Sequence, residues 1–173
     1  VSEGDEVMLC TAGGKVVRFK ESDARPMGRA AAGVRGAALR EGDRVVALVA
    51  GTESELLLVA CENGYGKRTR IGEFRLTNRG SQGVVGIKTS DRNGPVVNAL
   101  NASRCDDVLF MTQSGMMVRT EVNDISTQGR ATQGVRLVNL KDGDQLVRMA
   151  PVVRDEEEKE EPVGASAEGK SDE

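Results

Sequence analysis

The sequence "GRATQGVRLVNLKDGDQLV" (Gly129–Val147) decides the fold, because the chain contains two further versions of it. One is "NRGSQGVVGIKTSDRNGPVV" (Asn78–Val97), and the other is "GRAAAGVRGAALREGDRVV" (Gly28–Val46). Each version contains the motif Arg-x-x-x-Gly. The glycines of this motif are Gly33, Gly83 and Gly134, which lie 50 and 51 residues apart. The chain is therefore a series of three repeats.

A second landmark keeps the same period. The stretches "LCTAGGKVVRF" (Leu9–Phe19), "VACENGYGKRT" (Val59–Thr69) and "FMTQSGMMVRT" (Phe110–Thr120) align without a gap. Their turn glycines are Gly14, Gly64 and Gly115, and their arginines are Arg18, Arg68 and Arg119. Two landmarks that share a period near 50 residues indicate a propeller or another stacked array.

The sequence of each repeat indicates four β-strands. In the third repeat, Val108–Thr112 and Met116–Glu121 form a hairpin around a Gln-Ser-Gly turn. We expect the third strand over Gly134–Leu140 and the fourth over Gln145–Met149. No segment shows a sustained 3.6-residue apolar period. The predicted fold is all-β, a propeller-like array of three four-stranded blades with no substantial helix.

The blades are expected at about residues 5–49, 55–100 and 107–149, within a domain that covers 1–154. A single four-stranded sheet buries little surface alone, so each blade must pack against its neighbours. Closed propellers have about four to eight blades. The array therefore either continues before the first residue or forms an open arc, whose unpaired strand edges favour dimers or aggregation.

Composition excludes several classes of protein. The chain has no His, which removes Ser-His-Asp and Cys-His catalysis. The widely spaced Cys10, Cys61 and Cys105 do not form a zinc site, and we expect reduced, apolar side chains. We therefore predict no catalytic residue and no metal ligand. No apolar run approaches the roughly 20 residues of a membrane helix, so no membrane partner and a cytoplasmic location are expected.

Charge divides the chain into two parts. Residues 155–173 contain nine acidic residues and two lysines, whereas residues 1–154 carry a net charge of +4. The acidic tail lacks apolar periodicity and is expected to be disordered. It either keeps the protein soluble or mimics a polyanion and competes for a basic surface of the body.

Basic residues of the body recur with the repeats. They are Lys15, Arg18, Lys67, Arg68, Arg70 and Arg119 on the second hairpin strand, Arg29, Arg79 and Arg130 in the following linker, and Arg35, Lys88 and Arg136 on the third strand. Equivalent positions of stacked repeats lie on one side, so these residues predict a stripe of cations. Each alone could be solvated or locally paired, and the linker arginines could instead bind turn carbonyls. Arg92 and Arg104 lie off the repeated positions.

A cationic stripe suits duplex DNA. Contacts to phosphate give affinity without sequence information. Only four aromatic residues occur, which argues against base stacking on single strands or RNA. Bending 20–30 base pairs smoothly costs about 1–6 kcal/mol, which distributed contacts to phosphate offset. A curved array with this stripe would bend DNA around its edge.

The repeated motifs, together with "DDVLFMTQSGMMVRTEVNDIS" (Asp106–Ser126), closely resemble the C-terminal domain of DNA gyrase A. The similarity covers about residues 5–150. It implies a β-pinwheel, a propeller-like disc whose blades exchange strands with their neighbours. Six blades are usual in that family, so the chain looks like the second half of the disc followed by the acidic tail.

The resemblance also implies a function. The rim of such a disc wraps duplex DNA independently of sequence and supports ATP-dependent negative supercoiling. Partners would be the rest of gyrase A and the gyrase B protein in an A2B2 assembly. ATP and Mg would act elsewhere in the holoenzyme, in the bacterial cytoplasm at the nucleoid. The catalytic tyrosine of that family does not correspond to Tyr65, which stands beside a hairpin turn.

One departure limits the expected strength of binding. The family's basic Gln-Arg-Arg-Gly-Gly-Lys-Gly loop, important for wrapping, is missing, and "NRGSQG" keeps only the cation of Arg79. We therefore expect weak DNA binding. Two other interpretations stay open. One is the corresponding C-terminal domain of topoisomerase IV, and the other is a propeller that binds an acidic protein.

Overall fold

The computed structural model describes residues 1–154, and the predicted acidic tail, 155–173, lies outside the described residues. The prediction of an all-β fold is confirmed. Helical structure in residues 1–154 is limited to 3-10 turns of three residues each. These are η1 (Glu21–Asp23), η2 (Ile71–Glu73), η3 (Ala102–Arg104) and η4 (Val122–Asp124).

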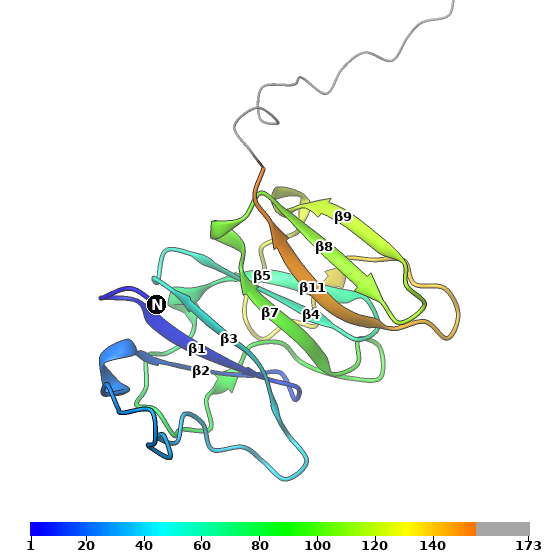
Figure 1. The fold of residues 1–173 in the computed structure, drawn as a ribbon. Helices are drawn as coiled ribbons and strands as arrows, with labels where there is room; N and C mark the ends of the chain where they lie inside the picture. Colours follow the sequence, from blue (N-terminus) through cyan, green and yellow to red (C-terminus); the bar gives the residue numbers. More distant parts are fainter. Residues whose placement is uncertain (155–173) are drawn as a thin grey trace, which may run out of the picture.

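The strands form three antiparallel sheets that lie next to one another (Figure 1). The first sheet has the order β3-β1-β2-β6 and contains β1 (Glu6–Thr11), β2 (Lys15–Lys20), β3 (Val45–Gly51) and β6 (Val84–Val85). The second has the order β10-β5-β4-β7 and contains β4 (Leu56–Cys61), β5 (Tyr65–Arg70), β7 (Val96–Asn101) and β10 (Val135–Arg136). The third, ordered β11-β8-β9, contains β8 (Asp107–Thr112), β9 (Met117–Glu121) and β11 (Leu146–Val152).

Each four-stranded sheet combines two repeats. Strand β6 comes from the second repeat but pairs with β2 of the first, with Lys15 opposite Val85. Strand β10 comes from the third repeat but pairs with β5 of the second, with Tyr65 opposite Arg136. This is the strand exchange that the family resemblance implied. It corrects the prediction of four strands within each repeat, since the third sheet has three strands among residues 1–154.

The third strand is also shorter than the predicted Gly134–Leu140. It ends at Arg136, because the amides of Leu137 and Val138 both donate to the carbonyl of Gly64 in the preceding hairpin turn. The backbone thereby leaves the sheet and crosses over that turn.

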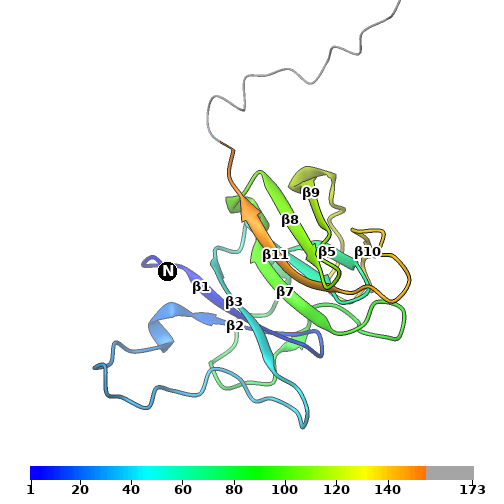
Figure 2. The same ribbon diagram turned by 45° about the vertical axis from the view of Figure 1, so that its right-hand side comes forward.

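The glycine of the Arg-x-x-x-Gly motif permits this exchange. Gly83 has φ +67°, and a Cβ there would stand 2.3 Å from the carbonyl oxygen of Val16. Gly134 has φ +79°, and its Cβ would stand 2.5 Å from the carbonyl oxygen of Gly66. Gly33 also has a positive φ, but a Cβ there would meet nothing within 4 Å. The segment around Gly33 forms no strand and runs as a long exposed loop (Figure 2).

Apolar side chains fill the spaces between neighbouring sheets. One cluster joins the first and second sheets and includes Met8, Leu57 and Phe74. Another joins the second and third sheets and includes Leu58 and Phe110. The blades therefore obtain their core by packing against each other, as expected for such repeats.

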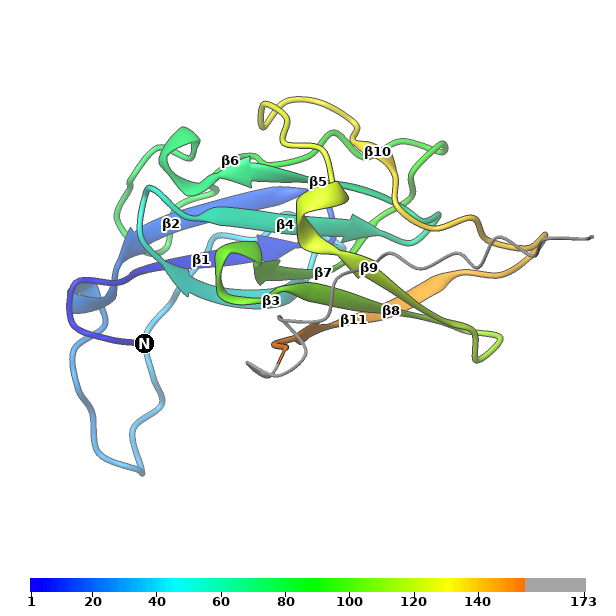
Figure 3. The same ribbon diagram turned by 90° about the horizontal axis from the view of Figure 1, so that it is seen from above.

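The two edges of the array differ. The last strands of the repeats, β3, β7 and β11, lie beside one another along one edge. The exchanged strands β6 and β10 lie on the opposite side, which we call the outer edge (Figure 3). The outer edge carries the segments that contain half of the predicted DNA contacts.

Candidate nucleic-acid interface

Each repeat has a connecting segment between its 3-10 turn and its last strand, namely residues 24–44, 74–95 and 125–145. These three connecting segments lie side by side along the outer edge. The amide of Ala38 donates to the carbonyl of Ser81 at 2.8 Å, and Gly80 donates to Gly36 at 2.6 Å. The amide of Lys88 donates to Thr132 at 2.9 Å. The structure therefore brings together the three segments that sequence analysis aligned.

Two of the three linker arginines, Arg79 and Arg130, join these segments. Nη1 of Arg79 donates to the carbonyl of Arg35 at 3.3 Å, and Nη1 of Arg130 donates to the carbonyl of Val85 at 3.2 Å. Arg35 and Val85 are equivalent, since each follows the motif glycine by two residues. Binding to backbone carbonyls, the alternative raised for the linker arginines, thus applies to Arg79 and Arg130.

Arg18 is a buried ion-pair partner. Its residue is 4% exposed, and its Nη2 lies 2.6 Å from Oε2 of Glu6. Its Nη1 donates to the carbonyls of Ile71 at 3.1 Å and Phe74 at 2.7 Å, at the 3-10 turn of the second repeat. The sequence predicts that Arg18 contacts DNA, but burial and these bonds leave it no exposed donor, so we remove it from the interface.

Arg68 holds the next junction in the same way. Its Nε donates to the carbonyl of Ile125 at 2.7 Å, and its Nη2 donates to the carbonyl of Asn123 at 3.2 Å. Leu56 takes the place of Glu6 on the neighbouring strand, so Arg68 has no acidic partner there. Burial lowers the pKa of Arg68. The guanidinium is half-buried and is committed to packing between blades.

Lys67 is fully buried, although the sequence predicts that it contacts DNA. Its Nζ donates to the carbonyls of Gly129 and Arg130 and to Oγ1 of Thr132 at 3.0 Å. Burial lowers the pKa of Lys67 to about 8, and the negative charge of Glu73 partly offsets this effect, so the amine stays mostly charged at neutral pH. Lys67 fixes the third connecting segment against β5 and is also removed from the interface.

Arg119 faces a buried carboxylate. Its Nη2 lies 2.6 Å from Oδ2 of Asp107, whose side chain is 1% exposed. Nη2 of Arg154 lies 2.6 Å from Oδ1 of the same carboxylate. Hydrogen bonds from Arg154 and Arg119 lower the pKa of Asp107. Asp107 therefore neutralises much of the charge that Arg119 would offer to a phosphate.

The other predicted contacts face solvent without a carboxylate. They are Lys15, Arg29, Arg35, Arg70, Lys88 and Arg136, of which Lys15 is half-buried and the rest are exposed. Within residues 1–154 none of them forms an ion pair. With the half-exposed Arg130 and the exposed Arg79, they make up the cationic part of the predicted stripe.

Arg92 joins this surface, although sequence analysis placed it off the repeated positions. Its Cζ lies 4.6 Å from the ring centroid of Tyr65, and Cζ of Arg136 lies 5.5 Å from the same centroid. Arg92 follows β6 in sequence, whereas Tyr65 begins β5 and Arg136 ends β10. The pairing of β10 with β5 brings Arg136 to Tyr65. Arg92 is held beside the same ring by its own loop, because Nδ2 of Asn63 donates to the carbonyl of Arg92 at 3.3 Å. These contacts depend on the fold, so the repeat period alone could not have found Arg92.

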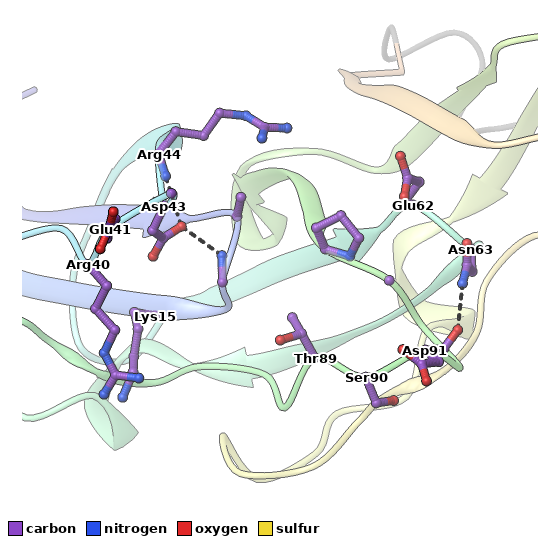
Figure 4. Close-up of a pocket in the computed structure, with 15 residues that line it drawn as sticks. Lys15, Arg40, Glu41, Asp43, Arg44, Glu62, Asn63, Thr89, Ser90 and Asp91 are labelled. Carbon is purple, nitrogen blue, oxygen red and sulfur yellow. Dashed lines mark hydrogen bonds between the residues drawn. The ribbon is translucent and has the colours of Figure 1, made fainter.

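A cleft of about 750 Å³ opens beside Lys15, between the hairpin turns of the first two blades (Figure 4). Lys15 and Arg40 lie side by side at one end, and Asn63 and Asp91 lie at the other. The lining also includes Arg44, Glu41, Asp43 and Glu62. Charges of both signs are mixed here, so the cleft does not extend the cationic surface.

Other chemistry has little support in the described part of the chain. No group of three or more His, Cys, Asp or Glu residues is placed to bind a metal ion among residues 1–154. Burial raises the pKa of the Cys10 and Cys61 thiols to about 12, which makes them poor nucleophiles. Within the same residues, no helix is long and apolar enough to span a membrane.

Several known proteins are similar to this chain. The DNA gyrase A protein of Chlamydia trachomatis serovar D is 46% identical over 174 residues, which cover 99% of this chain and 21% of that protein. The DNA gyrase A protein of Escherichia coli K12 is 46% identical over 167 residues, which cover 95% of this chain and 19% of that protein. The chain thus spans about a fifth of the length of these relatives.

Solved structures and a family model agree with these relatives. A structure of the DNA gyrase A C-terminal domain is similar with a TM-score of 0.81 and 30% identity, covering 88% of this chain and 52% of that one. The C-terminal domain of DNA topoisomerase IV gives a TM-score of 0.80 and 25% identity, covering 87% and 47%. The model of the DNA gyrase C-terminal domain, a β-propeller, matches residues 5–50, 55–103 and 106–152. Because this match extends over all three repeats, the chain belongs to the family of DNA gyrase C-terminal domains.

Proposed function

We propose that this chain binds duplex DNA independently of sequence and bends it along the outer edge of the array. One observation carries the proposal. The connecting segments of a gyrase C-terminal domain form a continuous surface here, and its cations face solvent without carboxylate partners. Contacts spread over three blades would follow the DNA backbone and release counterions from it.

The number of available cations favours weak binding. Arg18, Lys67 and Arg68 serve the packing between blades, and Asp107 neutralises much of Arg119. The surface that remains is smaller than the sequence predicted. Three blades would therefore bend a short duplex, while a full wrap would require the further blades of a larger disc.

We place the chain in the DNA gyrase A protein. It corresponds to about half of the similar gyrase domain structure, so the partners of these blades would include the rest of gyrase A and the gyrase B protein. In this assembly the bent DNA would support negative supercoiling, with ATP and Mg acting outside this chain. Breakage of DNA would likewise depend on residues elsewhere in the holoenzyme, in the bacterial cytoplasm.

The corresponding domain of topoisomerase IV is the second candidate, because its solved structure matches the fold almost equally well. Supercoiling distinguishes the two. When the chain is present in the full gyrase A protein together with gyrase B, relaxed plasmid should become negatively supercoiled with ATP. Relaxation alone would support the topoisomerase IV assignment.

Direct binding is tested by a gel-shift titration with random-sequence duplex over a series of salt concentrations. The logarithm of the association constant should fall linearly with the logarithm of salt concentration, with a slope of about −0.9 for each phosphate contacted. Affinity that does not respond to salt would overturn the proposal and favour a propeller that binds protein.

Variants locate the interface. Lys88→Gln and Arg29→Gln change exposed cations of the connecting segments, and each should make the slope less negative by about 0.9. Arg148→Gln is the matched control, because Arg148 is an exposed cation on β11 at the opposite edge. It should leave the slope unchanged.

A further inference from the structure

We infer that Arg92, Tyr65 and Arg136 form a clamp for the DNA backbone, in which two guanidinium groups held on one tyrosine ring bind phosphate. This inference rests on the proposed function and adds a specific binding site at the junction of the second and third repeats. Neither Arg92 nor Tyr65 is among the DNA-binding residues that the repeat pattern selects. We call the three residues the tyrosine clamp.

The tyrosine clamp is held by interactions with neutral groups. Nη2 of Arg136 donates to Oη of Tyr65 at 3.0 Å, and its Nη1 donates to Oδ1 of Asn139 at 3.4 Å. Nη1 of Arg92 donates to Oε1 of Gln133 at 3.3 Å. The half-buried Tyr65 ring therefore supports two exposed arginines in defined positions.

Two like charges converge in this arrangement. The guanidinium carbons lie no more than about 10 Å apart, since both lie over the same ring. The ring attracts each cation, with a typical gain of about 0.5–1 kcal/mol for exposed pairs, but it does not cancel their charges. Neither Arg92 nor Arg136 forms an ion pair within residues 1–154.

Other arginines of the chain show the contrast. Arg104 lies 2.8 Å from Glu55 and 3.1 Å from Asp5, and Arg154 lies 2.6 Å from Asp107. The arginines that stabilise the fold donate hydrogen bonds to carboxylates or to backbone carbonyls. The guanidinium groups of the tyrosine clamp meet side-chain amides and a phenol instead, and this leaves their charge available to an anion.

The chemistry fits a phosphodiester. Each guanidinium has five N–H donors in a planar fork that matches phosphate oxygens. The hydroxyl of Tyr65 accepts from Arg136 and can donate its own hydrogen to a further oxygen. Hydrogen bonds from Arg136 and Arg92 also lower the pKa of Tyr65, consistent with a positive local potential.

The equivalent junction between the first and second repeats supports the same location for a contact. Lys15 takes the place of Tyr65, directly after the turn glycine, and Val85 takes the place of Arg136 opposite it. Both junctions of the outer edge therefore offer a cation. At the first junction it is Lys15 itself, and at the second it is Arg136, which contacts the ring of Tyr65.

Salt-dependent binding to random-sequence duplex tests the tyrosine clamp in the whole chain. The double variant R92Q/R136Q should make the slope of log affinity against log salt less negative by about 1.8, whereas R148Q should leave it unchanged. Tyr65→Leu retains both charges and should weaken binding at low salt by severalfold, because the arginines lose their support. Tyr65→Phe, which keeps the ring, should bind more tightly than Tyr65→Leu.

Two outcomes would overturn the inference. If R92Q/R136Q keeps the wild-type slope while wild type itself shows a steep slope, the chain binds DNA but not through this site. If the variants only lower the melting temperature, the residues hold the blades together. A wild-type chain with no salt-dependent affinity would instead contradict the proposed function.

Tyr65 supplies a direct signal, since it is the only tyrosine in the sequence. In protein labelled with 13C-tyrosine, addition of duplex should shift this one ring resonance in a saturable manner. Inorganic phosphate at the same phosphate concentration should shift it much less. An unchanged resonance at saturating duplex would contradict the inference.

Discussion

Nη1 of Arg18 in the first blade donates a 2.7 Å hydrogen bond to the carbonyl of Phe74 in the second repeat. The same relationship recurs one repeat later, where Nε of Arg68 donates to the carbonyl of Ile125. Phe74 and Ile125 both follow a 3-10 turn, so each arginine caps the turn of the next repeat. These interblade arginines, Arg18 and Arg68, explain why arginine recurs at this position.

Substitution of Arg18 should destabilise the fold strongly. Arg18→Gln removes the partner of Glu6 and the side-chain donor to the buried carbonyl of Phe74, while the carbonyl of Ile71 keeps only its bond from the amide of Phe74. The free energy of unfolding should therefore fall by about 3 kcal/mol. Arg70→Gln, at an exposed position of β5, should change it by less than about 0.5 kcal/mol. Urea denaturation followed by circular dichroism measures both. Equal effects would mean that Arg18 does not join the blades.

The motif glycines allow a second paired test. Gly33→Ala places a Cβ at positive φ, which costs about 1–2 kcal/mol. Gly134→Ala incurs the same cost and also brings the Cβ to 2.5 Å from the carbonyl oxygen of Gly66. The melting temperature should therefore fall further for Gly134→Ala than for Gly33→Ala. A larger loss for Gly33→Ala would contradict the described packing of β10 on β5.

Much of the fold was predictable because short stretches of sequence, taken by themselves, indicate the hairpins. The Gly-containing turns and flanking apolar residues gave the hairpins β1-β2, β4-β5 and β8-β9. The partner of the third strand was not predictable from the residues, since Val84–Val85 and Val135–Arg136 carry no local mark of the sheet they join. It was the family resemblance that implied the exchange.

The candidate site was harder to predict, and the reason is physical. Every blade must hold the next one, so a residue that recurs with the repeat is often required for packing, as Arg18 and Arg68 are. Contact with a flexible polyanion does not demand an identical position in each blade. Arg92 lies off the period yet reaches Tyr65 beside Arg136.

Acid should weaken the junction at Arg104. The hydrogen bond from Arg104 holds the pKa of Glu55 at about 2 in the folded protein, below an unfolded value of about 4.3. This stabilisation is complete above the unfolded pKa and is lost as pH falls from about 4.3 to about 2. Wild-type stability should therefore decline over this interval, and Glu55→Gln should show a shallower decline.

Thermal unfolding at several pH values between 6 and 2.5 measures the effect. Glu41→Gln is the control, because Glu41 is exposed and has no ion pair in the described part of the chain. It should follow the wild-type curve. A Glu55→Gln curve parallel to wild type would show that the ion pair with Arg104 contributes nothing to acid sensitivity.

Deletion of residues 155–173 should strengthen DNA binding. These residues carry nine acidic residues and two lysines, and the remaining body has a net charge of +4. If the tail competes with DNA for the outer edge, its removal should raise affinity most at low salt, where electrostatic competition is least screened. A gel-shift comparison of the two chains across the salt series measures this. A chain with scrambled residues 155–173 should behave like the intact one, because charge rather than order would matter. Equal affinity after deletion would assign the tail to solubility alone.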